Sequence, residues 1–319
     1  MFSLFPVHRP RLGLSFRAQA LELVEVRRRW NRLATVTRLA SQSLPAGLLV
    51  PSATAPNMAD PSAVTKELEA LLQHVRDRAV AIDLPMACGT SALCHFETFP
   101  TAHAEQDALL RWRLRQDEHL TTSDLTLRWQ AFPAAEPSST AVSILVVAIR
   151  HSILDQYHQV CEKAGLIPVS MGFSTFHLLY LARSVFLTET EVYVAHRTAE
   201  ALIVLAFRHG RPVRLRVKPL RRMSADLNTE LLQTLQYFSQ DDSPRDYAVA
   251  RTTPLYLVEE GAATVPSVGQ GPSEVWTLSE QPGWTVPVVR AHWATAPIVS
   301  VVATPDQPPF GALACVLAS

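Results

Sequence analysis

The residues from Leu12 to Val26 have the pattern of a strand, a tight turn and a second strand. A turn of this kind can surround phosphate oxygens when glycine lets the backbone approach closely and a side chain supplies a cation or a metal-binding carboxylate. Here the corresponding positions hold Ser15, Arg17 and Glu22. The segment therefore keeps the apolar framework of a phosphate-binding turn without its polar groups, which argues against catalysis.

The same pattern occurs a second time in the chain. Residues 191–207 again consist of an apolar strand, a polar break and an apolar strand, and a turn at residues 208–211 leads into a further strand at 213–217. This recurrence predicts a chain built from two related halves.

Other catalytic or metal sites are not predicted. The sequence contains no G-x-S-x-G, G-x-x-x-x-G-K-S/T or G-x-G-x-x-G motif. His151 and His158, with Asp155 between them, could contribute to a metal site. Such a site would need a further ligand and supporting hydrogen bonds, and we interpret these residues as an exposed helix flank. The four cysteines match neither a zinc pattern nor a compact disulfide framework, and we interpret them as small core residues.

Composition excludes several classes of function. Hydrophobic residues make up 48% of the chain and charged residues 18%, with 29 acidic and 29 basic side chains. This balance creates no long-range field that would attract nucleic acid or anionic lipid. No segment reaches the roughly 18 to 20 continuous apolar residues of a membrane span, and the first residues do not form a secretory signal. We therefore expect a cytoplasmic protein that does not bind nucleic acid.

The order of the expected elements indicates an α/β fold. Asp60 is placed to cap a helix that begins at Pro61, and a buried strand at residues 78–84 follows it. Later helices are expected at residues 153–164, where Gly165 ends the helix, and at residues 174–183.

Residues 85–150 depart from this alternation of strands and helices, because they contain several strands and only one helix, at residues 104–116. This predicts a small inserted subdomain. A last long helix is expected at residues 224–238. We predict a first domain over residues 11–186, containing the insertion, and a second domain over residues 187–319 with a C-terminal part rich in proline and glycine.

Several segments, in this order and spacing, resemble the PilM-type proteins of type IV pilus assembly. They are LGLSFRAQALELVEV at Leu12, LPAGLLVPSATAPNMADPSAV at Leu44, AIDLP at Ala81, RWRLRQ at Arg111, VVAIRHSILDQYHQVCEKAGLIPVSM at Val146, FSTFHLLYL at Phe173 and ELLQTLQYF at Glu230. The resemblance implies the fold of actin and FtsA, a duplicated ribonuclease H-like α/β fold of two related domains.

The resemblance also marks where this chain departs from the family. In the first phosphate turn Ser15 replaces an aspartate, Arg17 a glycine and Glu22 a lysine, and in the second turn Val194 and His196 stand in the family's DIG segment. These changes remove the carboxylate that would bind a metal and the glycine that would let the backbone approach the phosphate closely. We therefore predict that the chain holds no metal and no cofactor, with ATP and magnesium as the alternative. Arg17 could hold an anion, although we favour a solvated turn residue.

In the resembling family, a groove between the first domain and its insertion takes the N-terminal cytoplasmic peptide of a PilN-type membrane protein. Phe96, Phe99, Leu110 and Trp112 are the candidates for this contact here. The alternative for each of them is a place in the subdomain's own core.

The resulting expectation is a non-catalytic actin-like scaffold of a type IV pilus or related secretion machine. It would lie at the cytoplasmic face of the inner membrane, held there by a PilN-like single-span membrane protein and other platform proteins. Two alternatives stay open: a divergent actin-like ATPase of the same machinery, and the cytoplasmic L-type component of type II secretion.

Overall fold

The structure is a computed structural model of the 319-residue chain. It describes residues 10–28, 34–117, 124–134, 139–181, 190–198, 200–220, 227–240, 255–259, 274–277, 285–290 and 299–301. The chain forms two compact units. The first consists of Met1–Cys88, His151–Ala182 and His292–Ser319, and the second of Gly89–Arg150 and Arg183–Ala291.

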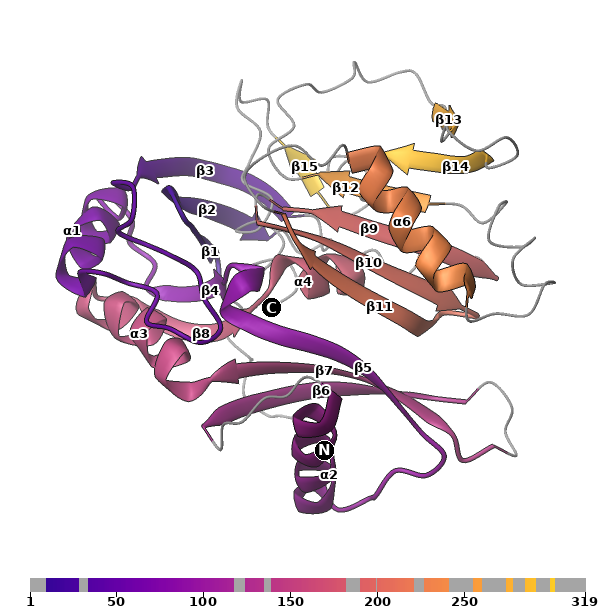
Figure 1. Cartoon of the computed structure of the whole chain (residues 1–319). Coiled ribbons are helices and arrows are strands. Elements are labelled where there is room, and N and C mark those ends of the chain that lie inside the picture. The colour runs from indigo at the N-terminus through magenta and orange to yellow at the C-terminus, as the bar shows by residue number, and fades with distance from the viewer. Residues whose placement is uncertain are drawn as a thin grey trace. The chain divides into compact units, whose positions relative to one another are not determined.

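The first unit is built on a six-stranded sheet with the order β15-β3-β2-β1-β4-β8 (Figure 1). Its strands are β1 (Leu12–Arg17), β2 (Ala20–Arg28), β3 (Ala34–Ser43), β4 (Ala79–Asp83), β8 (Ile167–Gly172) and β15 (Val299–Val301). The strands β1, β2 and β3 are antiparallel, whereas β4 runs parallel to β1 and β8 runs parallel to β4. The carboxyl ends of β1, β4 and β8 therefore meet at one edge of the sheet, which is where ligands bind in many α/β folds.

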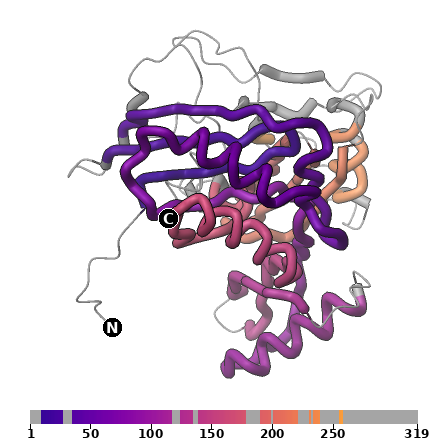
Figure 2. The backbone as a smooth tube through the Cα atoms, turned by 90° about the vertical axis from the view of Figure 1, so that its left-hand side faces the viewer, coloured from indigo at the N-terminus to yellow at the C-terminus, as the bar shows by residue number. Residues whose placement is uncertain are grey.

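Helices α1 (Pro61–Leu71) and α3 (His151–Lys163) pack side by side in the first unit (Figures 1 and 2). The Asp60 carboxylate accepts hydrogen bonds from the backbone N–H groups of Ser62 and Ala63, which confirms the predicted cap. The α3 stripe of Ile153, Tyr157, Val160 and Cys161 is buried as its spacing predicts, and Gly165 follows with a φ of +76°. Helix α4 (Ser174–Leu181) follows β8.

The second unit repeats this sheet topology. Its sheet has the order β11-β10-β9-β12-β14-β13, from β9 (Glu191–Arg197), β10 (Ala201–Arg208), β11 (Arg211–Pro219), β12 (Leu255–Glu259), β13 (Glu274–Thr277) and β14 (Thr285–Arg290). The order β11-β10-β9-β12-β14 corresponds to β3-β2-β1-β4-β8, with the same change from antiparallel to parallel pairing. Helix α6 (Leu227–Gln240) packs through Leu231, Leu235 and Phe238 against one face. The prediction of two related halves is confirmed.

The predicted insertion forms a three-stranded sheet and one helix. A short 3-10 helix (Met86–Cys88) leads into β5 (Gly89–Phe96), α2 (His103–Asp117), β6 (Leu125–Pro133) and β7 (Val142–Arg150), and the sheet order is β5-β7-β6. The chain enters and leaves the insertion from the first unit, but the insertion itself falls in the second unit. The predicted domain boundaries follow chain order instead and stay a prediction, and much of the C-terminal part rich in proline and glycine lies outside the described residues.

Three of the cysteines, Cys88, Cys94 and Cys161, are buried thiols outside any disulfide among the described residues, as expected of core residues, and Cys315 lies outside the described residues. Burial raises the pKa of the Cys161 thiol, so this group stays a protonated, inert part of the core. Within the described ranges, no helix has the length and apolarity that crossing a membrane requires.

A buried side-chain amide helps to anchor the long connection between β3 and α1. Asn57 Nδ2 donates to the Tyr157 hydroxyl and to Cys88 Sγ, each at 3.1 Å, and its Oδ1 accepts the N–H of Ser52 at 2.8 Å. Asn57 is 1% exposed, so each of these polar groups depends on the others for its hydrogen bonds.

We expect Asn57→Ala to lower the free energy of unfolding by about 1 to 3 kcal/mol, because it removes the hydrogen bonds of the buried Asn57 side chain to the Tyr157 hydroxyl and the Ser52 N–H. Urea unfolding measures this change. Gln116→Ala, at an exposed position of α2, is the control and should change stability by less than about 0.5 kcal/mol. An Asn57→Ala protein as stable as the control would contradict the anchoring role.

Candidate functional site

Four polar side chains share one face of the first sheet, at the end of β1. Ser15 lies directly opposite Glu22 on β2 and opposite Asp83 on β4. Arg17 follows Ser15 by two residues, and side chains two apart on a strand point to the same face. The strand register therefore brings Ser15, Arg17, Glu22 and Asp83 together.

Asp83 is the centre of this cluster. Its carboxylate is fully buried and accepts a hydrogen bond from Ser15 Oγ at 2.8 Å on one oxygen and from the backbone N–H of Ser174 at 2.5 Å on the other. Ser174 is the first residue of α4, whose N-terminal N–H groups favour a negative charge. Asp83 thus ties β1, β4 and α4 together.

Arg17 supplies the compensating positive charge. Its Nη2 lies 3.2 Å from Asp83 Oδ2, and its Nε lies 3.6 Å from Glu22 Oε2. The Arg17 side chain is 13% exposed, so this guanidinium is a largely buried partner of a buried carboxylate. The prediction of a solvated turn residue is wrong, because the strand period turns Arg17 toward Asp83.

Ser15 replaces the aspartate of the family's first turn, as the sequence shows, but sequence reasoning missed a carboxylate nearby. Asp83 places an acid on the neighbouring strand, within hydrogen-bond distance of Ser15. An acidic residue at the end of the buried strand AVAID is the signal that could have identified it, since polar residues at the carboxyl ends of parallel strands gather at one edge.

The chemistry that this cluster supports is limited by its charges. A phosphate oxygen approaching here would face the carboxylates of Asp83 and Glu22, and a divalent cation would meet the guanidinium of Arg17. Arginine stays protonated, so no change of pH near neutrality removes this barrier. The arrangement therefore stabilises the turn between β1 and β2.

The second phosphate turn lies on β9, in the second unit. Val194 and His196 are each 1% exposed and belong to the interior of that sheet. Thr198 Oγ1 accepts the backbone N–H groups of Glu200 and Ala201, which closes the turn into β10. This turn thus uses its own hydroxyl to satisfy its backbone donors.

An imidazole on α4 lies close to the Asp83 cluster, because His177 follows Ser174 by three residues and contacts the strand next to Asp83. His177 on α4 packs against Gly172, the β8 residue that pairs with Asp83, and a Cβ atom at Gly172 would meet His177 Nε2 at 2.9 Å. Burial lowers the pKa of His177 to about 4, so its ring is neutral at pH 7. Its Nδ1 has no hydrogen-bond partner within the part of the chain that the structure describes.

The four predicted partner contacts occupy different environments in the inserted subdomain. Leu110 is fully buried in the core and is corrected to a packing residue, because its position on α2 faces the sheet. Phe96 and Phe99 are partly buried, and their rings are in tilted contact with centroids 5.4 Å apart. Trp112 is 51% exposed and is the candidate most accessible to another molecule.

The predicted exposed flank of α3 is confirmed. His151 lies 3.5 Å from Asp155, and His158 lies 3.3 Å from Glu162, all with exposed side chains. No group of three or more His, Cys, Asp or Glu side chains placed to hold a metal occurs among the described residues. The expected absence of a metal stays a prediction.

Comparison with known proteins gives a likeness in structure. Neither a protein-family model nor a curated protein sequence matches the chain. The solved PilM–PilN type IV pilus biogenesis complex is similar over 98% of this chain and 98% of the compared chain, with 21% identity and a TM-score of 0.68.

The chain has an actin-like fold. Two further solved structures are similar at lower scores. One is the cytoplasmic domain of EpsL from the type II secretion system of Vibrio cholerae, with 11% identity, coverage of 83% and 87%, and a TM-score of 0.45. The other is a Bacteroides thetaiotaomicron protein with an actin-like ATPase fold, with 10% identity, coverage of 81% and 84%, and a TM-score of 0.43. The fold class and the resemblance to PilM-type proteins are thereby confirmed at the level of structure.

We expect Arg17→Met to lower the free energy of unfolding by about 3 kcal/mol, because it leaves the Asp83 carboxylate buried without its cation. The double variant Arg17→Met/Asp83→Asn removes both charges and should recover at least half of that loss. Urea unfolding of the two variants and the wild type measures the coupling. A double variant no more stable than Arg17→Met would contradict a charge-neutralising role for Arg17.

The lowered pKa of His177 predicts a pH dependence of stability. The unfolded chain binds a proton at this residue below its ordinary pKa of 6.5, whereas the folded chain does so only near 4. Stability is therefore fully present above about pH 6.5 and falls by up to about 3 kcal/mol as the pH drops toward 4. Urea unfolding at pH 7 and pH 5 measures the loss, which should be clearly smaller in His177→Leu. Equal losses in both proteins would exclude His177 as the cause.

Proposed function

We propose that this protein is a non-catalytic actin-like scaffold of a type IV pilus or related secretion machine. It binds partner segments and does not turn over nucleotide. Its place is the cytoplasmic face of the inner membrane, where a single-span, PilN-like membrane protein holds it through a short N-terminal peptide.

The pairing of Arg17 with Asp83 is the observation that supports the absence of nucleotide turnover. In an actin-like ATPase, the carboxyl ends of the central strands must receive a metal-bound phosphate. Here a guanidinium 3.2 Å from the buried carboxylate already neutralises it. Breaking such a pair to admit magnesium would cost several kcal/mol, which an ATP-binding site of ordinary affinity does not recover.

The likeness to the PilM–PilN complex supports the choice of machine and partner. That complex belongs to type IV pilus biogenesis, and the similarity extends over nearly the whole of both chains. An inserted subdomain with one largely exposed tryptophan, Trp112, offers a surface of the aromatic kind that peptide partners use.

A second candidate function, a divergent actin-like ATPase of the same machinery, is favoured by one observation. Asp83 supplies a fully buried carboxylate at the edge where the parallel strands end, and a carboxylate is the group that would bind magnesium or orient water. For this candidate to hold, Arg17 must leave Asp83 when nucleotide enters.

Two titrations of the full-length protein test the proposal. In calorimetry with ATP and magnesium, we expect no heat of binding up to about 1 mM nucleotide, and a Kd in the micromolar range would contradict the proposal and favour the ATPase candidate. The second titration uses the fluorescently labelled N-terminal cytoplasmic peptide of a PilN-like single-span membrane protein, with a scrambled peptide as control. Selective binding of the native peptide is expected, and equal polarisation with both peptides would reject the partner role.

A further inference from the structure

The second unit contains an apolar groove between the inserted sheet and the hairpin of β10 and β11. The groove has a volume of about 250 Å³. Its walls come from the ends of β5, β6 and β7 and from β11, through Phe96, Phe132, Val142 and Val213. The exposed residues Ala141 and His209 lie where the groove opens to solvent.

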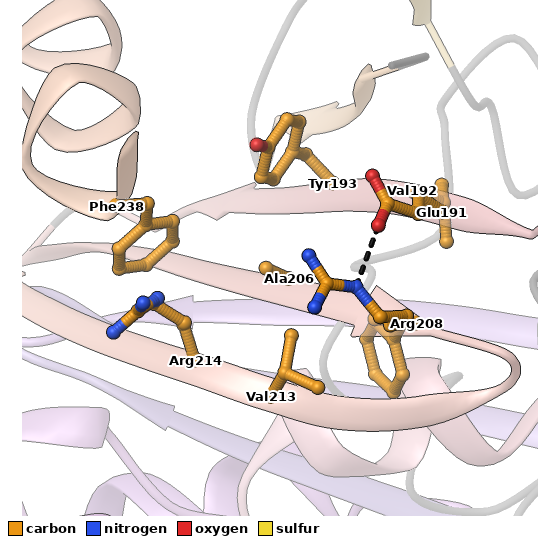
Figure 3. A pocket seen from close by; sticks show the side chains of 9 residues that line it. Glu191, Val192, Tyr193, Ala206, Arg208, Val213, Arg214 and Phe238 are labelled. Atoms are coloured by element: carbon orange, nitrogen blue, oxygen red, sulfur yellow. Dashed lines mark hydrogen bonds and ion pairs between the residues drawn. The ribbon is translucent and has the colours of Figure 1, made fainter. Parts of the chain in front are cut away.

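The charged groups around this groove are all basic. Arg208, His209 and Arg211 line it from the hairpin and His95 lines it from β5, whereas no aspartate or glutamate is among the lining residues. Arg208 is paired with Glu191 on β9 at 2.6 Å, as the dashed line in Figure 3 shows, where both also border a smaller cavity. Within the described ranges, no carboxylate lies within ion-pairing distance of Arg211.

The groove is held in place by rigid local structure. The two-residue turn His209–Gly210 has positive φ values of 50° and 72°, the geometry of a tight hairpin turn, and it sets Arg208 directly opposite Arg211. On the other wall, the Phe96 ring is in tilted contact with the ring of Phe99 behind it, with centroids 5.4 Å apart. Arg208 is already paired with Glu191, so Arg211 is the guanidinium of this hairpin with which an incoming carboxylate would pair.

The state of His95 is consistent with a positive local field. Its Nδ1 lies 2.9 Å from Ser143 Oγ, and it also hydrogen-bonds to the backbone of Val213. Burial lowers the pKa of His95, the hydrogen bond to Val213 opposes this shift, and the nearby guanidinium groups of Arg214 and Arg113 lower the pKa further.

We propose that this groove is a docking site for an acidic peptide segment in which a carboxylate side chain lies next to an aromatic or aliphatic one. The apolar walls take the apolar side chain, and Arg211 pairs with the carboxylate. A volume of about 250 Å³ suits one or two side chains of an extended segment, and is smaller than the pockets that usually enclose a whole small-molecule ligand. The site does not depend on the proposed function and would stand even if the chain bound ATP.

Fluorescence polarisation of the full-length protein tests this site with a labelled peptide of sequence Glu-Phe-Glu-Leu-Glu. We expect saturable binding, which the peptide Lys-Phe-Lys-Leu-Lys should not show because its charges match those of the groove. Arg211→Glu should weaken binding of the acidic peptide about tenfold or more. This variant places a carboxylate opposite Arg208, so its fold should be retained.

Two further variants separate docking in the groove from general attraction to a basic surface. Phe132→Ala leaves the net charge unchanged and should also weaken binding several-fold, because it removes an apolar wall. Arg115→Glu, an exposed position of α2 away from the groove, is the matched charge control and should change affinity less than twofold. Absence of wild-type binding, equal binding of both peptides, or equal losses in Arg211→Glu and Arg115→Glu would each overturn the proposal.

Discussion

The central constraint in the first half of this protein is the full burial of one carboxylate, that of Asp83. A buried charge is tolerated only when hydrogen bonds and an opposite charge compensate for the water it has lost. Ser15 on the adjacent strand, the N-terminus of α4 and the guanidinium of Arg17 provide this compensation. Because these groups come from β1, β4 and α4, the parallel part of the sheet and the helix that follows it are fixed by the same interaction.

This constraint also separates an actin-like fold from actin-like chemistry. The sheet edge that collects phosphate and metal in such folds keeps its geometry here, including a carboxylate and a helix N-terminus. Arginine changes what that edge can do, because it carries a permanent charge in the place of an exchangeable cation. The residues at this edge pair with one another and stabilise a turn, which is the basis of the proposal that the protein works by docking.

The two halves share a sheet topology but carry different features at their strand ends. In the first half the strand ends hold the Asp83 cluster, whereas in the second half Val194 and His196 are buried and the hairpin of β10 and β11 extends to a groove shared with the inserted sheet. A tight hairpin that places Arg211 beside the apolar side chains of Phe96 and Phe132 is preorganised for an extended, acidic segment. The architecture therefore offers recognition surfaces that do not require a nucleotide to order them.

The sequence by itself determined the elements and their order. Alternation in Leu12–Phe16, the cap at Asp60, the buried stripe of α3 and the repeat at residues 191–217 are local patterns, and each depends only on residues close in the chain. Only the tertiary structure decided the site. Asp83 meets Ser15 and Arg17 across 68 and 66 residues of sequence, through a strand register that no local pattern contains. The burial of Leu110 was also decided by the tertiary structure, because it depends on which face of α2 meets the inserted sheet. The groove was decided in the same way, because its two walls, the inserted sheet and β11, are more than 60 residues apart in the chain.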